Sequence, residues 1–131
     1  MPVYQDIAPP VPLTFEAEAA VVLNRLVKIG TASNQVVPVA GITDRVVGVA
    51  VESADPAAGN SAVSVWPLNR GGIVPMEAAA AITVNTRVAP SANGRAQTAV
   101  STQFAVGIAL KGAGGAGEII PVLVEVADQA I

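Results

Sequence analysis

At 131 residues and 13.1 kDa, the chain has the length of a single domain. It is 52% hydrophobic yet only 3% aromatic and 13% charged, and 25 Ala and 22 Val supply most of the apolar residues. The absence of Cys and His excludes disulfide scaffolds, zinc sites built on these residues, and Cys or His catalysis. A net charge of -3 leaves no basic surface for nucleic acid. We therefore expect a protein with no catalytic, cofactor or metal site, which acts through its surface.

Neither a membrane span nor an export signal is expected. The longest apolar runs, such as Val46 to Val51, hold about six residues, whereas a membrane helix needs about 20. The first basic residue is Arg25, and prolines interrupt the first twelve residues, so the pattern of a secretory signal is missing. The chain is therefore expected to stay in the cytoplasm in which it is made.

Residues 1–12 are predicted to form an extended N-terminal arm. Proline fixes its own φ and drives the preceding residue toward extended backbone, so the prolines stiffen this segment. The apolar side chains of the segment indicate an arm bound to a partner, and a frayed terminus is the alternative. The candidate contact residues in the arm are Val3, Tyr4, Ile7, Pro9, Pro10, Val11 and Pro12.

Residues 13–131 are predicted to form one all-β domain, a small β-barrel or sandwich. Short Val- and Ile-rich runs recur between clusters of Gly, Pro, Asn, Asp and Ser, which supply turns. The composition of Glu16 to Val22 and Met76 to Ala81 allows at most one or two short helical turns. The expected strands are Leu13 to Glu16, Leu26 to Ile29, Val36 to Val39, Val46 to Glu52, Ala62 to Trp66, Gly72 to Glu77, Arg87 to Ala89, Ala96 to Val100, Ala105 to Lys111 and Ile119 to Val126.

An internal repeat indicates that the domain is built from two similar halves. The segment Val47 to Val51 matches Val106 to Leu110 at a spacing of 59 residues. Residues 20–66 and 79–125 are therefore predicted to be two copies of one unit, packed as the halves of one barrel or sandwich. A chance match in a chain so rich in Ala and Val is the alternative. The pairs given by a gapless spacing include Val63 with Val122 and Val65 with Val124.

No segment carries the pattern of a ligand site. Gly112 and Gly117 have the spacing of a phosphate-binding loop, but Glu118 replaces the lysine that such a loop needs, and a strand follows. We expect this segment to connect two strands. Nothing resembles the oxygen-rich loop of a calcium site, so the acidic pairs are expected to be solvated. These pairs are Glu16 with Glu18 and Glu52 with Asp55.

Trp66 is a further candidate contact residue. Strand alternation places its side chain opposite those of Val63 and Val65, either toward solvent or a subunit, or into the end of the barrel. A small-ligand site or enzyme at the barrel mouth is the alternative to a purely structural role. The polar residues that such a site would use are Arg45, Glu52, Arg70 and Glu77.

The small side chains of the chain favour assembly into an oligomer. Ala buries little area, and a buried Val contributes only about 1.5 to 3 kcal/mol, so one copy is expected to have a thin core. A mean hydropathy of +0.56 with low charge indicates that part of the exterior is an apolar interface. We expect a homo-oligomer, or a protein attached to a larger lattice.

Six motifs follow one another along most of Leu13 to Val126. They are Val47-Gly48-Val49-Ala50, a small acidic loop ending Ala58-Gly59, Val63-Ser64-Val65, Gly72-Ile73-Val74-Pro75-Met76, Val106-Gly107-Ile108-Ala109 and Val122-Leu123-Val124. This series resembles the capsid cement, or head decoration, proteins of tailed bacteriophages. One departure is Asn85-Thr86, because family members often carry Gly-Asp or Gly-Gln before the strand that begins here at Arg87.

The resemblance implies a structural protein on the outer surface of a phage head, made in the host cytoplasm. It implies two partners, the major capsid protein and further copies of the chain, commonly in a homotrimer, and neither nucleic acid nor membrane. The protein would stabilise the capsid by cementing neighbouring capsid proteins, with the arm along a capsid subunit or a neighbouring trimer. The alternatives are another virion structural domain, in a tail, a baseplate or a capsid insertion, and a small-ligand-binding barrel.

Overall fold

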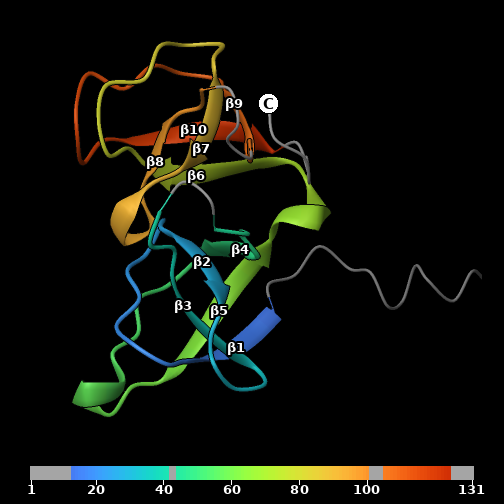
Figure 1. Cartoon of the computed structure of the whole chain (residues 1–131), viewed down its shortest axis with the longest axis vertical. Coiled ribbons are helices and arrows are strands. Elements are labelled where there is room, and N and C mark those ends of the chain that lie inside the picture. The colour runs from blue at the N-terminus through green and yellow to red at the C-terminus, as the bar shows by residue number, and fades with distance from the viewer. Residues whose placement is uncertain (1–12, 42–43, 101–104, 125–131) are drawn as a thin grey trace, which may run out of the picture.

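The computed structural model describes residues 13–41, 44–100 and 105–124. These residues contain ten short strands (Figure 1). A strand is present at each of the ten places expected from the sequence, and the all-β prediction is confirmed. The predicted arm lies outside the described residues. The strands are β1 Leu13–Ala17, β2 Leu26–Ile29, β3 Gln35–Pro38, β4 Gly48–Ala50, β5 Ala62–Pro67, β6 Ile73–Glu77, β7 Arg87–Pro90, β8 Ala96–Thr98, β9 Gly107–Ala109 and β10 Ile119–Val124.

The first five strands form a closed barrel in the order β1-β3-β2-β4-β5. Neighbouring strands are antiparallel except β1 and β3, which run parallel with Ala17 opposite Val36. Alternation along β5 turns Val63 and Val65 inward, where both are fully buried. The barrel is therefore complete within residues 13–67.

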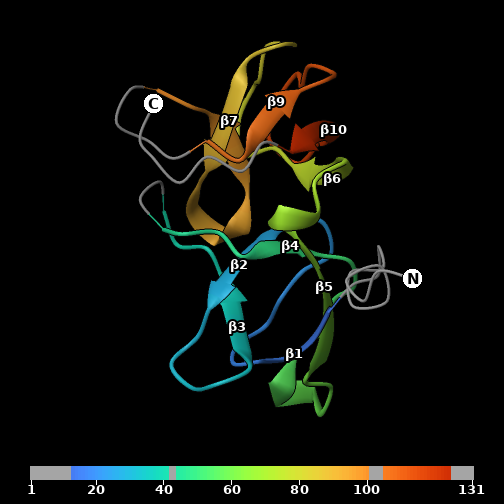
Figure 2. The ribbon, with the colours of Figure 1, turned by 90° about the vertical axis from the view of Figure 1, so that its right-hand side faces the viewer.

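Strands β6 to β10 form a second sheet in the order β6-β10-β9-β7-β8. Its edge strands approach each other through an isolated parallel bridge between Ala78 and Ala96. Figures 1 and 2 show the second sheet stacked on the barrel along the long axis of the molecule. The predicted β-barrel is confirmed, and the strands of each half pair only with strands of that half, so the second half forms a sheet of its own.

The second sheet repeats the pairing pattern of the barrel. Gly48 lies opposite Val27 in the barrel, and Gly107 lies opposite Val88 in the second sheet. A Cβ atom added to either glycine would lie 2.3 Å from a backbone oxygen of the neighbouring strand. Both sheets therefore need glycine at this position so that two backbones can approach closely.

The spacing between equivalent strands changes along the chain. Ala50 lies opposite Val65 in the barrel, and Ala109 lies opposite Val122 in the second sheet. Val65 therefore corresponds to Val122, and its gapless pairing with Val124 is wrong. The segment that joins β4 to β5 is two residues longer than the segment that joins β9 to β10, which shifts the spacing from 59 to 57 residues.

Left-handed asparagines occupy equivalent turns of the two sheets. Asn24 has φ 69° and Asn85 has φ 67°, and their N–H groups donate to the carbonyls of Ala50 and Ala109. Asparagine tolerates this backbone conformation better than other side chains do. Asn85 can therefore occupy this turn without a glycine.

Two hydrophobic cores stabilise the fold. The barrel core consists of Ala17, Val21, Val27, Val36, Ala50, Ala54, Val63 and Val65, with Phe15 packed against it. The second core consists of the buried side chains of the second sheet and extends to the barrel, where residues of the first half join it. These residues are Leu26, Val39, Val49 and Leu68. We call the region in which these four residues meet the second sheet the junction.

In the described parts of the chain, helical structure is limited to short 3-10 turns. Pro56–Ala58 and Leu68–Arg70 form two such turns, and Ala92–Gly94 forms a third segment in which Asn93 is left-handed. Neither of the two segments whose composition allows a helical turn forms one: Ala78, for example, donates its N–H to the Glu118 carbonyl and bridges Ala96. Strand pairing outweighs the high intrinsic helix propensity of alanine there. Within the described residues, no helix is long and apolar enough to span a membrane.

Candidate interaction surface

Trp66 lies at the junction between the barrel and the second sheet. Its side chain is half-buried, packs against the second core, and points away from the barrel core that holds Val63 and Val65. Its Nε1–H donates to the carbonyl oxygen of Gly71 at 3.2 Å. The indole therefore holds the two sheets together, a role that sequence reasoning missed. Its contact with a partner stays a prediction.

The other candidate contact residues lie outside the described residues, and their assignment also stays a prediction. They are Val3, Tyr4, Ile7, Pro9, Pro10, Val11 and Pro12.

The outer side of the second sheet carries apolar side chains over three adjacent strands. Cross-strand pairing places Ile73, Leu123 and Ile108 in one row, and Pro75 lies opposite Pro121 in the next. Ile73 is 62% exposed and Leu123 is 40% exposed. We call this surface the apolar face. Its residues are Ile73, Pro75, Ile108, Leu110, Ile119, Pro121 and Leu123.

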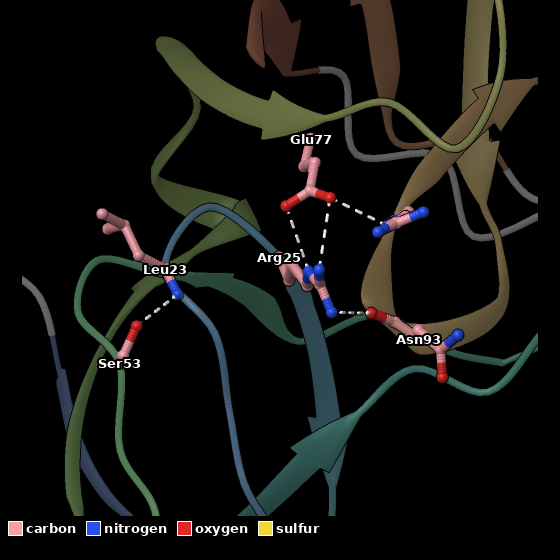
Figure 3. Close-up of polar contacts among 6 residues, drawn as sticks. Leu23, Arg25, Ser53, Glu77 and Asn93 are labelled. Atoms are coloured by element: carbon pink, nitrogen blue, oxygen red, sulfur yellow. Dashed lines mark hydrogen bonds and ion pairs between the residues drawn. The ribbon is translucent and has the colours of Figure 1, made fainter. Parts of the chain in front are cut away.

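Arg25 and Glu77 form the main polar contact of the junction (Figure 3). The Arg25 Nε and Nη2 groups donate to the two carboxylate oxygens of Glu77 at 3.1 and 3.2 Å. Arg25 Nη1 also donates to the Asn93 carbonyl at 3.5 Å, and Arg95 Nε lies 2.8 Å from Glu77 Oε2. Glu77 is buried, so this cluster fixes the position of the second sheet on the barrel.

Two of the residues considered for a ligand site, Glu52 and Glu77, make separate contacts in the described structure. Glu77 is neutralised by Arg25 and Arg95, whereas Glu52 accepts a hydrogen bond from the Ser64 N–H at 2.8 Å. Arg45 is exposed, and the side chain of Arg70 lies outside the description. Across the described residues, no group of three acidic side chains is placed to hold a metal ion.

Carboxylates instead stabilise the loops of the barrel. The N–H and the hydroxyl of Thr31 both donate to Glu18 at 2.7 Å, which lowers the pKa of Glu18. The Ala40 N–H donates to Asp44 at 2.7 Å and lowers its pKa, with a further contribution from Lys28 at 3.1 Å. Each carboxylate thus accepts hydrogen bonds from the loop in its ionised form.

The glycine-rich segment after β9 binds a carboxylate of the chain itself. Glu118 accepts hydrogen bonds from the N–H groups of Gly114 and Gly115, the latter at 2.9 Å. The residue at the position of the phosphate-binding lysine therefore occupies the donors that a phosphate would need. The segment connects β9 to β10, as predicted.

Comparison with known proteins decides between the classes that this surface leaves open. A family model described as phage cement protein matches residues 5–126. The chain belongs to the phage cement protein family. The resemblance found in the sequence is thereby confirmed, and the chain is a structural protein of the phage virion that associates with the head. The match includes most of the predicted arm.

The fold of this cement protein is shared with a solved phage structure. The N base of head fiber gp8.5 in bacteriophage phi29 superimposes with a TM-score of 0.69 over 92% of this chain and 97% of that chain. The two sequences are 19% identical, so the likeness concerns the fold. No curated protein matches the cement protein significantly.

Proposed function

We propose that the chain cements the phage head from its outer surface by bridging neighbouring major capsid proteins. Membership of the phage cement protein family carries this proposal. The described residues are consistent with it, because their carboxylates are engaged in loops and ion pairs while an apolar face is exposed. A protein of this kind acts by adhesion and needs no catalytic group, cofactor or metal.

The proposed mechanism combines self-association with attachment to the head. The chain is made in the host cytoplasm and assembles as a homotrimer, and its arm, residues 1–12, lies along a capsid subunit or a neighbouring trimer. Apolar strand surfaces bind the copies to one another. Because three arms act from one assembly, individually weak contacts with the head add up to stable binding.

A second candidate is the base of a longer head appendage. The shared fold with the N base of a phage head fiber favours it, since that protein is also attached to a head. A cement function predicts that the chain makes heads more resistant to heat or to loss of DNA. A base alone predicts attachment without this gain.

The test uses phage heads that lack the chain. We expect the purified protein to co-sediment with them and to raise the temperature at which they release DNA. Deleting Pro2 to Pro12 weakens binding while the far-ultraviolet spectrum stays unchanged. The matched control replaces only Gln5 with Ser and binds normally. A full-length protein that ignores the heads refutes the proposal, and full occupancy by the truncated protein refutes the role of the arm.

A further inference from the structure

The apolar face is not a requirement of the fold. The equivalent rows of the barrel pair Thr14 with Ser64 and Glu16 with Ala62 across β1 and β5. In the second sheet, Pro75 and Pro121 replace the first of these pairs. The same architecture therefore tolerates polar side chains at these positions. Apolar residues exposed together on one side of a sheet indicate a binding surface.

The barrel has a row of residues that is equivalent to one row of the apolar face, and this barrel row is already an interface inside the chain. Val49 lies opposite Trp66 in the barrel, as Ile108 lies opposite Leu123 in the second sheet. The second sheet covers the barrel row at the junction, where Val49 is fully buried and Trp66 packs on the second core. The equivalent row of the second sheet stays uncovered, with Leu123 at 40% exposure.

We propose that the apolar face is the site at which a second copy of this chain docks. The barrel row binds the second sheet within the chain. The equivalent row of the second sheet is also apolar, so it is suited to bind a sheet that belongs to another copy. This inference deepens the proposed function by naming the surface of self-association, and it rests on that function for its role on the head.

Charge supports the same occupant. The chain carries a net charge of -3, so two copies approach most easily where carboxylates are absent or neutralised. The apolar face contains no charged residue, and Glu77, which lies opposite Ile119, is buried beneath Arg25 and Arg95. Exposed Arg87 lies beside Ile108 at the rim, where it offers a positive charge to an acidic copy.

The experiment compares two matched double variants of the full chain. Ile73→Glu with Leu123→Lys places an opposite-charge pair on the apolar face, where the two residues are cross-strand neighbours. Thr14→Glu with Ser64→Lys places the same pair on the equivalent strands of the barrel. Both variants keep the net charge. Opposite charges on neighbouring strands attract each other, so neither pair is expected to disrupt its sheet. Solution mass is measured by light scattering over a range of concentrations.

We expect the wild type and the barrel variant to form the same oligomer. The apolar-face variant should self-associate more than about tenfold more weakly, because two buried apolar side chains are lost from the interface. A monomeric wild type, or an apolar-face variant of unchanged mass, overturns the inference. Circular dichroism checks folding, and Leu123→Gln alone replaces the double variant should that variant unfold.

Binding to heads separates this inference from the proposed function. An apolar-face variant that stays oligomeric but no longer binds heads assigns the surface to the head and overturns docking of a second copy. An apolar-face variant that is monomeric but retains weak head binding supports it. A wild type that is oligomeric through this surface yet ignores the heads refutes the cement function alone.

Discussion

Arg25 and Glu77, 52 residues apart in the chain, meet in a two-bond ion pair that joins the barrel to the second sheet. The contact lies beside two backbone hydrogen bonds across the same boundary. Glu77 N–H donates to the Asn24 carbonyl at 3.0 Å, and Gly94 N–H donates to the Val39 carbonyl at 2.8 Å. Polar and apolar contacts therefore hold the two sheets in one arrangement.

Replacing Glu77 with Gln should lower the free energy of unfolding by about 2 kcal/mol. The change leaves Arg25 and Arg95 close together without a neutralising charge. Urea denaturation measures the effect. The control is Lys28→Met, which removes the more exposed pair with Asp44 and should cost less than about 1 kcal/mol. Equal losses in the two variants contradict a special role for Glu77.

Gly48→Ala and Gly107→Ala should each destabilise the chain by about 2 kcal/mol or more, because the new methyl group meets a backbone oxygen that cannot rotate away. Thermal melting followed by circular dichroism reports the loss. Gly41→Ala serves as the comparison, since no atom lies within 4 Å of its added Cβ. Similar melting temperatures for all three variants are inconsistent with the close strand approach described above.

Asn85→Gly should leave stability nearly unchanged, whereas Asn85→Val should cost about 1 to 2 kcal/mol. The reason is the left-handed backbone at this position, which a β-branched side chain does not adopt readily. The same pair of substitutions at Asn24 provides an internal replicate. A valine variant as stable as the glycine variant rules out backbone strain as the determinant of this turn.

Acid should destabilise the barrel loops. The pKa values of Glu18 and Asp44 are lowered in the folded state, so the unfolded chain binds more protons as the pH falls. The contribution of these two carboxylates to the free energy of unfolding is complete above the ordinary carboxyl pKa range, near pH 5. It is lost as the pH drops through their lowered pKa values in the folded state. Glu18→Gln and Asp44→Asn should flatten the dependence of the urea midpoint on pH between about 5 and 3. An unchanged slope excludes these two groups as its source.

Local signals in the sequence were sufficient to locate the strands. Apolar runs between glycine, proline and asparagine turns predicted each of the ten strands of the described residues, including β4 around Gly48 and β9 around Gly107. The gapless repeat failed at Val65 because loops of different length displace the equivalent strands. Family motifs identified the class, since they combine several short segments in a fixed order.

Long-range contacts were beyond such signals. Nothing near Arg25 indicates Glu77, and the ambiguity over Trp66 arose because alternation gives a side of the strand without saying what covers it. The apolar face was hidden for a related reason. In β10, both sides of the strand are apolar, so the pattern from Ile119 to Val124 does not distinguish the core side from the outer side.

The unequal distribution of the two cores has a consequence for biosynthesis. The barrel core uses residues of the first half alone, whereas the second core takes Leu26, Val39, Val49 and Leu68 from the first half. The first half can therefore close as soon as it leaves the ribosome, and its upper surface then serves as the template on which the later strands collapse. The first half is synthesised first and does not need the second half for its own core. The second half is synthesised later, when the surface on which it packs is already in place.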